Sequence, residues 1–320
     1  MRVLPFIMLA LAVAFTSNAQ AEYPDRPIRL IVPQAAGSAT DTVARLLQPE
    51  LAREIGQPIL IDNRPGGALT IGIDLVAKAA PDGYTIGMGP VGALAITRHM
   101  VAKLPYDIER DLEPVALLTR GQLLLAVTPS LPVKSVPELI AYAKDKPGKL
   151  MNASSSNGSP GHVGGELFKS MTGTDIVHVP YRGGAQAIGD LAAGQVNLMF
   201  ESLNSIGPHA RAGSVRALAV SGARRSPSLP DLPTIAEAGV PGYEAATWSG
   251  VIAPAGLPAP IRDKLNAAIN RAIQSPTFRQ HFAALGDEPA GGTPAEFADV
   301  IRKDSAKWAD VVRRSGARLD

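Results

Sequence analysis

The stretch Val32-Pro33-Gln34-Ala35-Ala36-Gly37-Ser38-Ala39-Thr40-Asp41 directly continues the apolar run Ile28–Val32. This order predicts a buried strand that ends in a loop of small residues and continues into a helix over Asp41–Ile55. The backbone N–H groups of such a loop converge on one spot, and the helix N-terminus adds a partial positive charge there. The sequence therefore indicates an anion-binding site built without lysine or arginine.

A second loop of the same kind is Asn152-Ala153-Ser154-Ser155-Ser156-Asn157-Gly158-Ser159-Pro160-Gly161-His162. Ser159 is expected to cap its helix, with Pro160 at the first helical position. In the first loop, Thr40 or Asp41 is expected to be the cap. Ligands of open α/β sheets bind at the carboxyl ends of the strands. Two such loops therefore favour a ligand site over ordinary capped turns.

Strand-like and helix-like runs alternate along most of the chain, and this pattern occurs twice. It predicts an α/β fold with two similar lobes, each built on parallel strands. We expect the first lobe to comprise residues 22–122 and 246–320, and the second lobe residues 123–245. The chain then crosses between the lobes near Arg120–Leu123 and Glu244–Thr247, which would make a hinge and a closing cleft. The C-terminal helices are expected to pack back onto the first lobe.

The N-terminus has the pattern of an export signal. Arg2 is followed by the apolar run Val3–Phe15, which is too short to span a bilayer, and then by Ala19-Gln20-Ala21. Cleavage after Ala21 would leave 320 − 21 = 299 residues; an N-terminal membrane anchor is the alternative. The chain has no cysteine, which excludes disulfides and a lipid-modified cysteine. We expect a soluble periplasmic protein of a double-membrane bacterium.

The composition argues against several classes of partner. The formal net charge is +2, or +1 without Arg2, which provides no field for nucleic acid or anionic lipid. Aromatic residues make up 5% of the chain, too few to favour stacking platforms for bases. His99, His209 and His281 lie far apart with no metal-ligand spacing, so we expect no metal and no cofactor.

Two histidines lie near the second loop. His162 begins the helix, where a cationic imidazole would oppose the helix dipole. We therefore expect His162 to be neutral and to hydrogen-bond either the loop or a ligand. His178 alternates within a strand and is expected to pack.

An enzymatic function has little support in the sequence. Ser159 has Asn157 two residues before it, so it does not form a Gly-x-Ser-x-Gly elbow. The first loop does not have the pattern GxGxxG, and GxxxxGK[ST] does not occur, so a nucleotide site has weak support. An exported α/β hydrolase remains one alternative to a receptor. A sensor that delivers the same ligand to a signalling partner is another.

Several segments together resemble the Bug family, the TctC-like substrate-binding receptors of tripartite tricarboxylate transporters. They span nearly the whole chain beyond the signal, in the family's order. The segments are Pro33–Asp41, Asp62–Gly66, Ala80–Thr85, Leu104–Asp107, Asn157–His162, Val179–Gly184, Arg216–Val220, Leu229–Thr234 and Ile252–Gly256.

The resemblance implies a two-lobed, type II periplasmic-binding-protein (Venus-flytrap) fold. It implies a receptor, expected to be monomeric, that captures a small carboxylate through backbone amides and ordered waters and passes it to membrane permease subunits. Asp41 would repel a carboxylate, so it is expected to be a helix cap or an acceptor for a ligand amine or hydroxyl. The ligand contacts that the resemblance implies are Gly37, Ser38, Ala39, Thr40, Asp41, Ser155, Ser156, Asn157, Gly158, Ser159 and His162.

The chain departs from the family pattern at three places. Gln34, which we include among the expected ligand contacts, replaces the usual aromatic, and Ser38 and Ala39 replace glycines. Pro90–Leu94 is apolar where Ser, Thr or His is common. We therefore predict a ligand with an apolar body, such as an aromatic or longer-chain carboxylate, rather than citrate. Trp248, near the second crossing, is expected either to stack on this ligand or to pack in the hinge.

Overall fold

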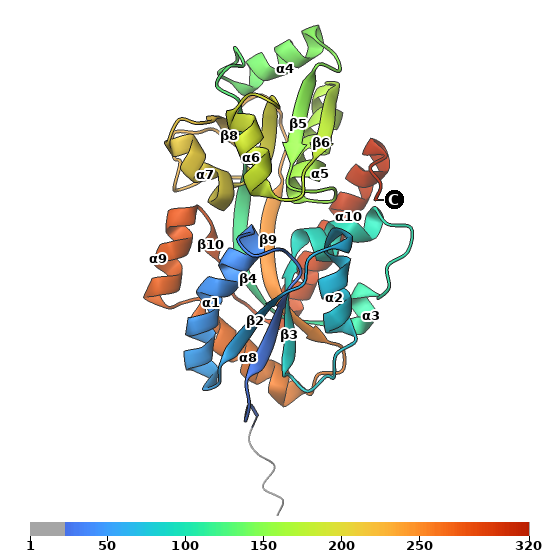
Figure 1. The fold of residues 1–320 in the computed structure, drawn as a ribbon, viewed down its shortest axis with the longest axis vertical. Helices are drawn as coiled ribbons and strands as arrows, with labels where there is room; N and C mark the ends of the chain where they lie inside the picture. The colour runs from blue at the N-terminus through green and yellow to red at the C-terminus, as the bar shows by residue number, and fades with distance from the viewer. Residues whose placement is uncertain (1–22, 320) are drawn as a thin grey trace, which may run out of the picture.

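The computed structural model describes residues 23–319, so the predicted export signal Met1–Ala21 lies outside the described residues. The strands join in one continuous ladder that runs through two lobes (Figure 1). Its order is β2 (Ile59–Asn63), β1 (Ile28–Val32), β3 (Thr85–Pro90), β9 (Ala246–Pro254), β4 (Leu112–Val127), β7 (Leu198–Ser202), β5 (Leu150–Ser154) and β6 (Ile176–Pro180).

The first lobe is built on β1, β2, β3, β9 and the first part of β4. β1 pairs in parallel with β2 and β3, and β9 then runs antiparallel to β3. β1 is apolar throughout except for Arg29, because helices cover both faces of a parallel sheet. These helices include α1 (Ala39–Ile55), α2 (Thr70–Ala77) and α8 (Ala259–Ala272).

The second lobe repeats this arrangement. β5 pairs in parallel with β6 and β7, so the order β6-β5-β7 matches β2-β1-β3 of the first lobe. The end of β4 runs antiparallel to β7 and to β8 (Arg216–Val220). The helices of this lobe are α4 (Val136–Asp145), α5 (Pro160–Thr172), α6 (Gly184–Ala192) and α7 (Leu203–Arg211). β1–α1 and β5–α5 are therefore equivalent units.

The two crossings between the lobes are neighbouring strands rather than separate loops. β4 pairs with β9 over Leu112–Gln122, with β7 over Leu123–Val127 and with β8 over Leu124–Val127. At the crossing, Gly121 of β4 is paired with Thr247 of β9. The segments predicted to form the hinge are thus the two strands of an antiparallel ribbon.

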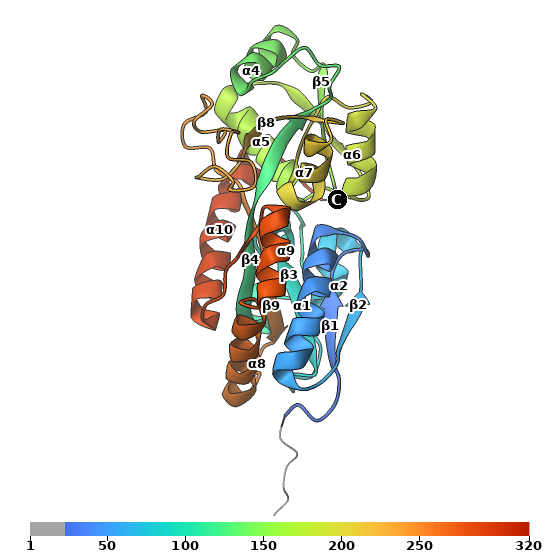
Figure 2. The same cartoon turned by 90° about the vertical axis from the view of Figure 1, so that its left-hand side faces the viewer.

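The C-terminal helices divide between the lobes. α8 packs against α1, whereas α9 (Pro276–Leu285) packs both on α1 and on α7 of the second lobe. α10 (Pro294–Ser315) packs on β4 and also on α5 of the second lobe, and Figure 2 shows it lying along both lobes. The expectation that the tail packs back onto the first lobe therefore describes α8, while α9 and α10 contact both lobes.

Several short elements were not predicted. They are η1 (Gly67–Leu69), η2 (Gly92–Ile96), η3 (Thr97–His99), α3 (Ile108–Asp111), α7, the first half of β4 and β10 (Glu288–Pro289). Every side chain of η2 is buried, which places the apolar run after β3 against the core. Within residues 23–319, no helix is long and apolar enough to cross a membrane.

Gly161 provides a test of how closely α5 packs on β7. A Cβ added at Gly161 would lie 2.0 Å from the carbonyl oxygen of Phe200. Gly161→Ala should therefore lower the free energy of unfolding by about 1–3 kcal/mol, measured by urea denaturation. Gly189→Ala is the control, because an added Cβ on this exposed part of α6 meets no heavy atom within 4 Å. Equal stability of the two variants would contradict this packing.

Candidate functional site

The two predicted loops form helix N-termini with the same capping geometry. In the first loop, Gly37 has a φ of +80° and Ser38 is the N-cap, whose Oγ accepts a hydrogen bond from the Asp41 N–H at 3.2 Å. The expectation that Thr40 or Asp41 caps this helix is wrong, because α1 begins two residues earlier than predicted. In the second loop, Ser159 is the N-cap as predicted, and its Oγ accepts from the His162 N–H at 3.3 Å.

The third helical residue reaches back in both loops to the glycine before the cap. Asp41 Oδ2 accepts from the Gly37 N–H at 2.8 Å, and His162 Nδ1 accepts from the Gly158 N–H at 3.2 Å. Gly158 has a φ of +73°, close to that of Gly37. The same two N–H groups are therefore satisfied at each helix start.

Other N–H groups in the first turn of each helix remain available. Within residues 23–319, those of Ala39 and Thr40 in α1 and of Gly161 in α5 have no hydrogen-bond acceptor. Pro160 has no N–H, so α5 offers one donor fewer than α1. With the helix dipole, these donors provide an attractive environment for an anion at each helix start.

Asp41 holds the first loop in place through hydrogen bonds. Its buried carboxylate accepts from Gly37, from Arg45 Nε at 2.7 Å and from Asn63 Nδ2 at 2.9 Å. Although burial opposes ionisation, the hydrogen bonds from Arg45, Gly37 and Asn63 lower the pKa of Asp41. Asp41 is therefore ionised and engaged by three donors of its own chain.

His162 holds the second loop in place through the hydrogen bond from the Gly158 N–H, and its imidazole is neutral. Burial, with smaller contributions from His178 and Lys169, lowers the pKa of His162 to about 3, as expected for a neutral imidazole. The ring stacks on His178 with centroids 3.7 Å apart, and His178 Nε2 lies 2.7 Å from Ser154 Oγ. Burial likewise lowers the pKa of His178, to about 4.

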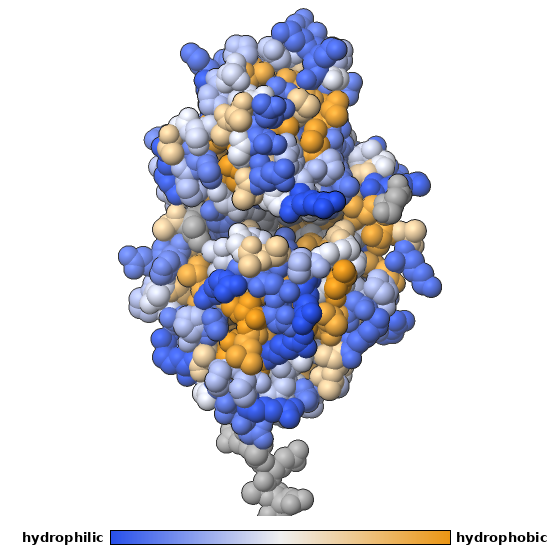
Figure 3. All heavy atoms as spheres, in the orientation of Figure 1, coloured by the Kyte–Doolittle hydropathy of each residue, from blue (hydrophilic) through white to orange (hydrophobic). Residues whose placement is uncertain are grey.

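The second loop lies against the first lobe. A Cβ added at Gly92, after β3, would lie 3.4 Å from the carbonyl oxygen of Gly158, and one added at Gly158 would lie 3.5 Å from Thr97 Oγ1. Figure 1 places the start of α1 and the β5–α5 loop on opposite sides of the waist, where the space-filling view is hollowed (Figure 3). The two anion-attracting loops therefore flank the junction of the lobes.

Comparison with known proteins identifies the family. Residues 43–317 match the sequence profile described as TctC, Tripartite tricarboxylate transporter family receptor. The chain belongs to this family. It is also 39% identical over 298 residues to protein BugT of Bordetella pertussis, covering 93% of this chain and 91% of BugT. The resemblance to the Bug family is thereby confirmed.

Solved structures of similar proteins carry carboxylates. R. palustris Rpa4515 with adipate is 42% identical, with a TM-score of 0.89 over 93% of this chain and all of that one. MatC from Rhodopseudomonas palustris with bound malate is 35% identical, with a TM-score of 0.85 over 91% of this chain and all of that one. The predicted two-lobed α/β fold is confirmed, and this TctC-family chain is a solute-binding receptor rather than an enzyme.

The remaining loop residues of this receptor differ in how they are engaged. Within the described part of the chain, the side chains of Thr40, Ser156 and Asn157 take part in no hydrogen bond recorded by the structure. The Oε1 atom of Gln34 is buried without a partner, while the Gln34 carbonyl accepts from Asn63 Nδ2 at 3.0 Å. These polar groups lie on or beside the two loops, and among them Thr40 and the Gln34 Oε1 atom are buried.

Trp248 lies in the packing between β9 and α10. Its indole is 3% exposed, donates its N–H to Asp304 and meets Phe297 edge-on with centroids 5.6 Å apart. Of the two roles expected for Trp248, these contacts match packing at the crossing strands. The ring joins the crossing strand to the helix that lies along both lobes.

One buried carboxyl group near the second loop was not predicted. Glu201 lies at the carboxyl end of β7, is 7% exposed, and has an Oε2 atom without a partner. No motif marks this residue in the sequence. Its only signal is its position at the end of the third strand of the second lobe.

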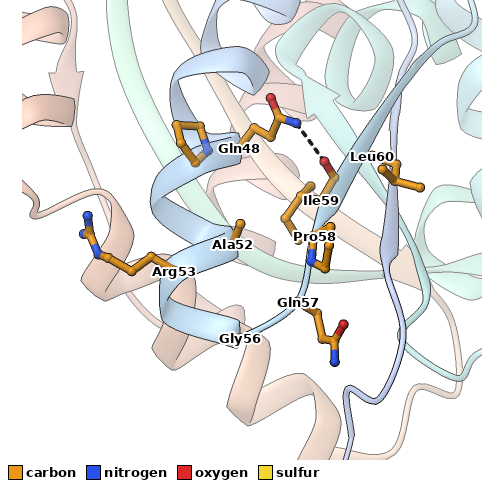
Figure 4. Close-up of a pocket in the computed structure, with 9 residues that line it drawn as sticks. Gln48, Ala52, Arg53, Gly56, Gln57, Pro58, Ile59 and Leu60 are labelled. Carbon is orange, nitrogen blue, oxygen red and sulfur yellow. Dashed lines mark hydrogen bonds between the residues drawn. The ribbon is translucent and has the colours of Figure 1, made fainter.

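A surface hollow of about 700 Å³ lies elsewhere (Figure 4). It is lined by the C-terminal half of α1 and the start of β2, with Gln48 Nε2 donating to the Ile59 carbonyl at 2.9 Å. It is therefore at the opposite end of α1 from Ser38. Over residues 23–319, no cluster of His, Asp or Glu side chains could hold a metal ion.

The neutral state of His162 predicts a pH-dependent stability. Its pKa is lower in the folded chain than in the unfolded chain, so acid favours unfolding as the pH falls below about 6.5. Between pH 7 and pH 5, the parent should lose about 2 kcal/mol more unfolding free energy than His162→Gln, which does not titrate. Urea denaturation at both pH values measures this. His281→Gln, at an exposed site on α9, is the control, and an equal loss in parent and His162→Gln would contradict the prediction.

Proposed function

We propose that this chain is a periplasmic receptor that captures a small organic carboxylate between the β1–α1 and β5–α5 loops and delivers it to a tripartite tricarboxylate-type permease. The observation that carries the proposal is the pair of helix starts with unsatisfied N–H groups at the junction of the lobes. The adipate of Rpa4515 and the malate of MatC support a carboxylate as the ligand class.

Amide and hydroxyl donors suit capture followed by release. They hold a carboxylate by charge-assisted hydrogen bonds without burying a lysine or arginine against it. A fully buried ion pair would be slow to part, because each charge left behind is costly. Ordered waters between the loops and the ligand would let the same frame accept acids of different length.

A known ligand in the family supports an acid with an apolar body. In this chain Val91, Ala93 and Leu94 after β3 pack in the core and are at most 1% exposed, so the support comes from the relative and not from these side chains. Adipate, which carries a methylene chain between its two carboxylates, is a ligand of this type. We propose an aromatic or longer-chain carboxylate rather than citrate.

The location and the lobe boundaries are part of the same proposal. The sequence of Met1–Ala21 supports export to the periplasm. Boundaries after residues 122 and 245 are supported by β4, which changes partners at Leu123. The permease and a signalling partner are the two candidate recipients of the ligand. The family description favours the permease.

Replacement of Ala39 by proline tests the helix-start donors. Ala39 is the first helical residue after Ser38, a position where proline is well tolerated and where α5 already has Pro160. Ala39→Pro removes one N–H with little effect on folding. It should weaken binding of the tightest-binding acid of a panel of adipate, malate, benzoate, hexanoate and citrate by about 1–2 kcal/mol, roughly five- to thirtyfold, measured by calorimetry.

Ala39→Gly is the matched control, because it retains the N–H. We expect it to bind within about twofold of the parent. Binding by Ala39→Pro equal to that of the parent would show that this donor does not hold the acid. Failure of every acid in the panel to bind the parent would overturn the proposed function, and a preference for citrate would overturn the proposed ligand type.

A further inference from the structure

Three features converge beside the second loop, at the carboxyl ends of β5, β6 and β7. Ser155 follows β5, Gly183 and Gly184 begin α6 after β6, and Glu201 lies at the end of β7. A Cβ added at Gly184 would lie 3.4 Å from Glu201 Oε2 and 3.8 Å from the Ser155 Cβ. Three separate segments therefore meet around one carboxyl group.

The hydrogen bonding of Glu201 is half complete. Its Oε1 accepts from the Ser202 N–H at 2.9 Å, whereas its buried Oε2 has no partner within the described residues. The N-cap of α6, Gly183, provides no side-chain cap. A buried polar atom without a partner is costly, so such an atom beside a ligand loop indicates a contact that the ligand completes.

No charged side chain compensates Glu201. Burial raises the pKa of Glu201 to about 7, while the N–H and hydroxyl of Ser202 and the nearby hydroxyl of Ser155 act in the opposite direction. None of the titratable side chains on or beside the elements packed against β7 contributes to this shift. These side chains are His162, Glu166 and Lys169 of α5, Arg182 and Asp190 before and in α6, His209 and Arg211 of α7, and Glu113 and Arg120 of β4.

We propose that Glu201 is a specificity residue of the second lobe and presents its Oε2 as a protonated carboxyl that donates a hydrogen bond to a carboxylate of the ligand. A buried carboxylate without a cation is unfavourable, whereas a carboxyl O–H needs an acceptor. An anionic ligand held by the second loop supplies that acceptor. The bound form retains the proton, so no charged pair is buried. This inference rests on the proposed function and names how the same site selects its acid.

Glutamine is the informative replacement, because its amide donates as a protonated carboxyl does but cannot ionise. The probe is adipate, or the tightest-binding acid of the panel above if adipate does not bind. At pH 6.5, Glu201→Gln should bind within about threefold of the parent, and Glu201→Ala should bind roughly tenfold or more weakly. Between pH 6.5 and 8.5, the parent's Kd should rise roughly ten- to thirtyfold while that of Glu201→Gln stays flat.

Glu166→Gln is the matched control, since Glu166 is also 7% exposed but both of its oxygens bond Lys169 Nζ, at 2.8 and 2.9 Å. It should keep the pH dependence of the parent. Marked weakening in Glu201→Gln at pH 6.5 would show that Glu201 binds as an ionised acceptor, and unchanged binding in Glu201→Ala would show no contact; either result overturns the inference while the proposed function stands. If no acid binds the parent, both fall together.

Discussion

The N–H groups left unpaired at the start of an α-helix are the constraint on which the rest of this structure depends. In α1 and α5 a serine cap satisfies one such group, and the third helical side chain satisfies the N–H of the glycine before the cap. What remains unpaired is a small set of donors at the same place in each lobe, the N–H groups of Ala39 and Thr40 in α1 and that of Gly161 in α5. The parallel strands before these helices place both sets at the junction of the lobes, so the fold and the binding chemistry have one origin.

The crossing strands determine how the two sets of donors are positioned relative to each other. β4 and β9 cross side by side as a hydrogen-bonded ribbon, with α10 packed on β4 and on α5. Trp248 joins the ribbon to α10 through Phe297 and Asp304. Movement between the lobes therefore bends a paired ribbon and shifts a packed helix, which favours a few defined arrangements over free swivelling.

The sequence predicts the features that depend on neighbouring residues. The apolar run of β1 and the serine–proline pair before α5 set their elements directly. Ser38, Thr40 and Asp41 are all residue types that cap helices well, so the sequence pattern does not determine at which of them the helix begins. The role of Asp41 depends on Asn63 of the next strand, and that of Trp248 on Asp304, 56 residues away in sequence. Glu201 stands out only once three strand ends are seen together.

Asp41 and His162, which hold the two loops in place, occupy equivalent positions and differ in charge. Asp41 is an ionised carboxylate paired with Arg45, and His162 is an uncharged ring stacked on another. The charge distribution at the junction is thus asymmetric, although the backbone of the two loops is nearly symmetric. An acid with two unlike ends would meet different electrostatic fields on the two sides, so its two head-to-tail orientations would differ in binding energy. A pseudo-symmetric site could therefore still select one orientation of an elongated ligand.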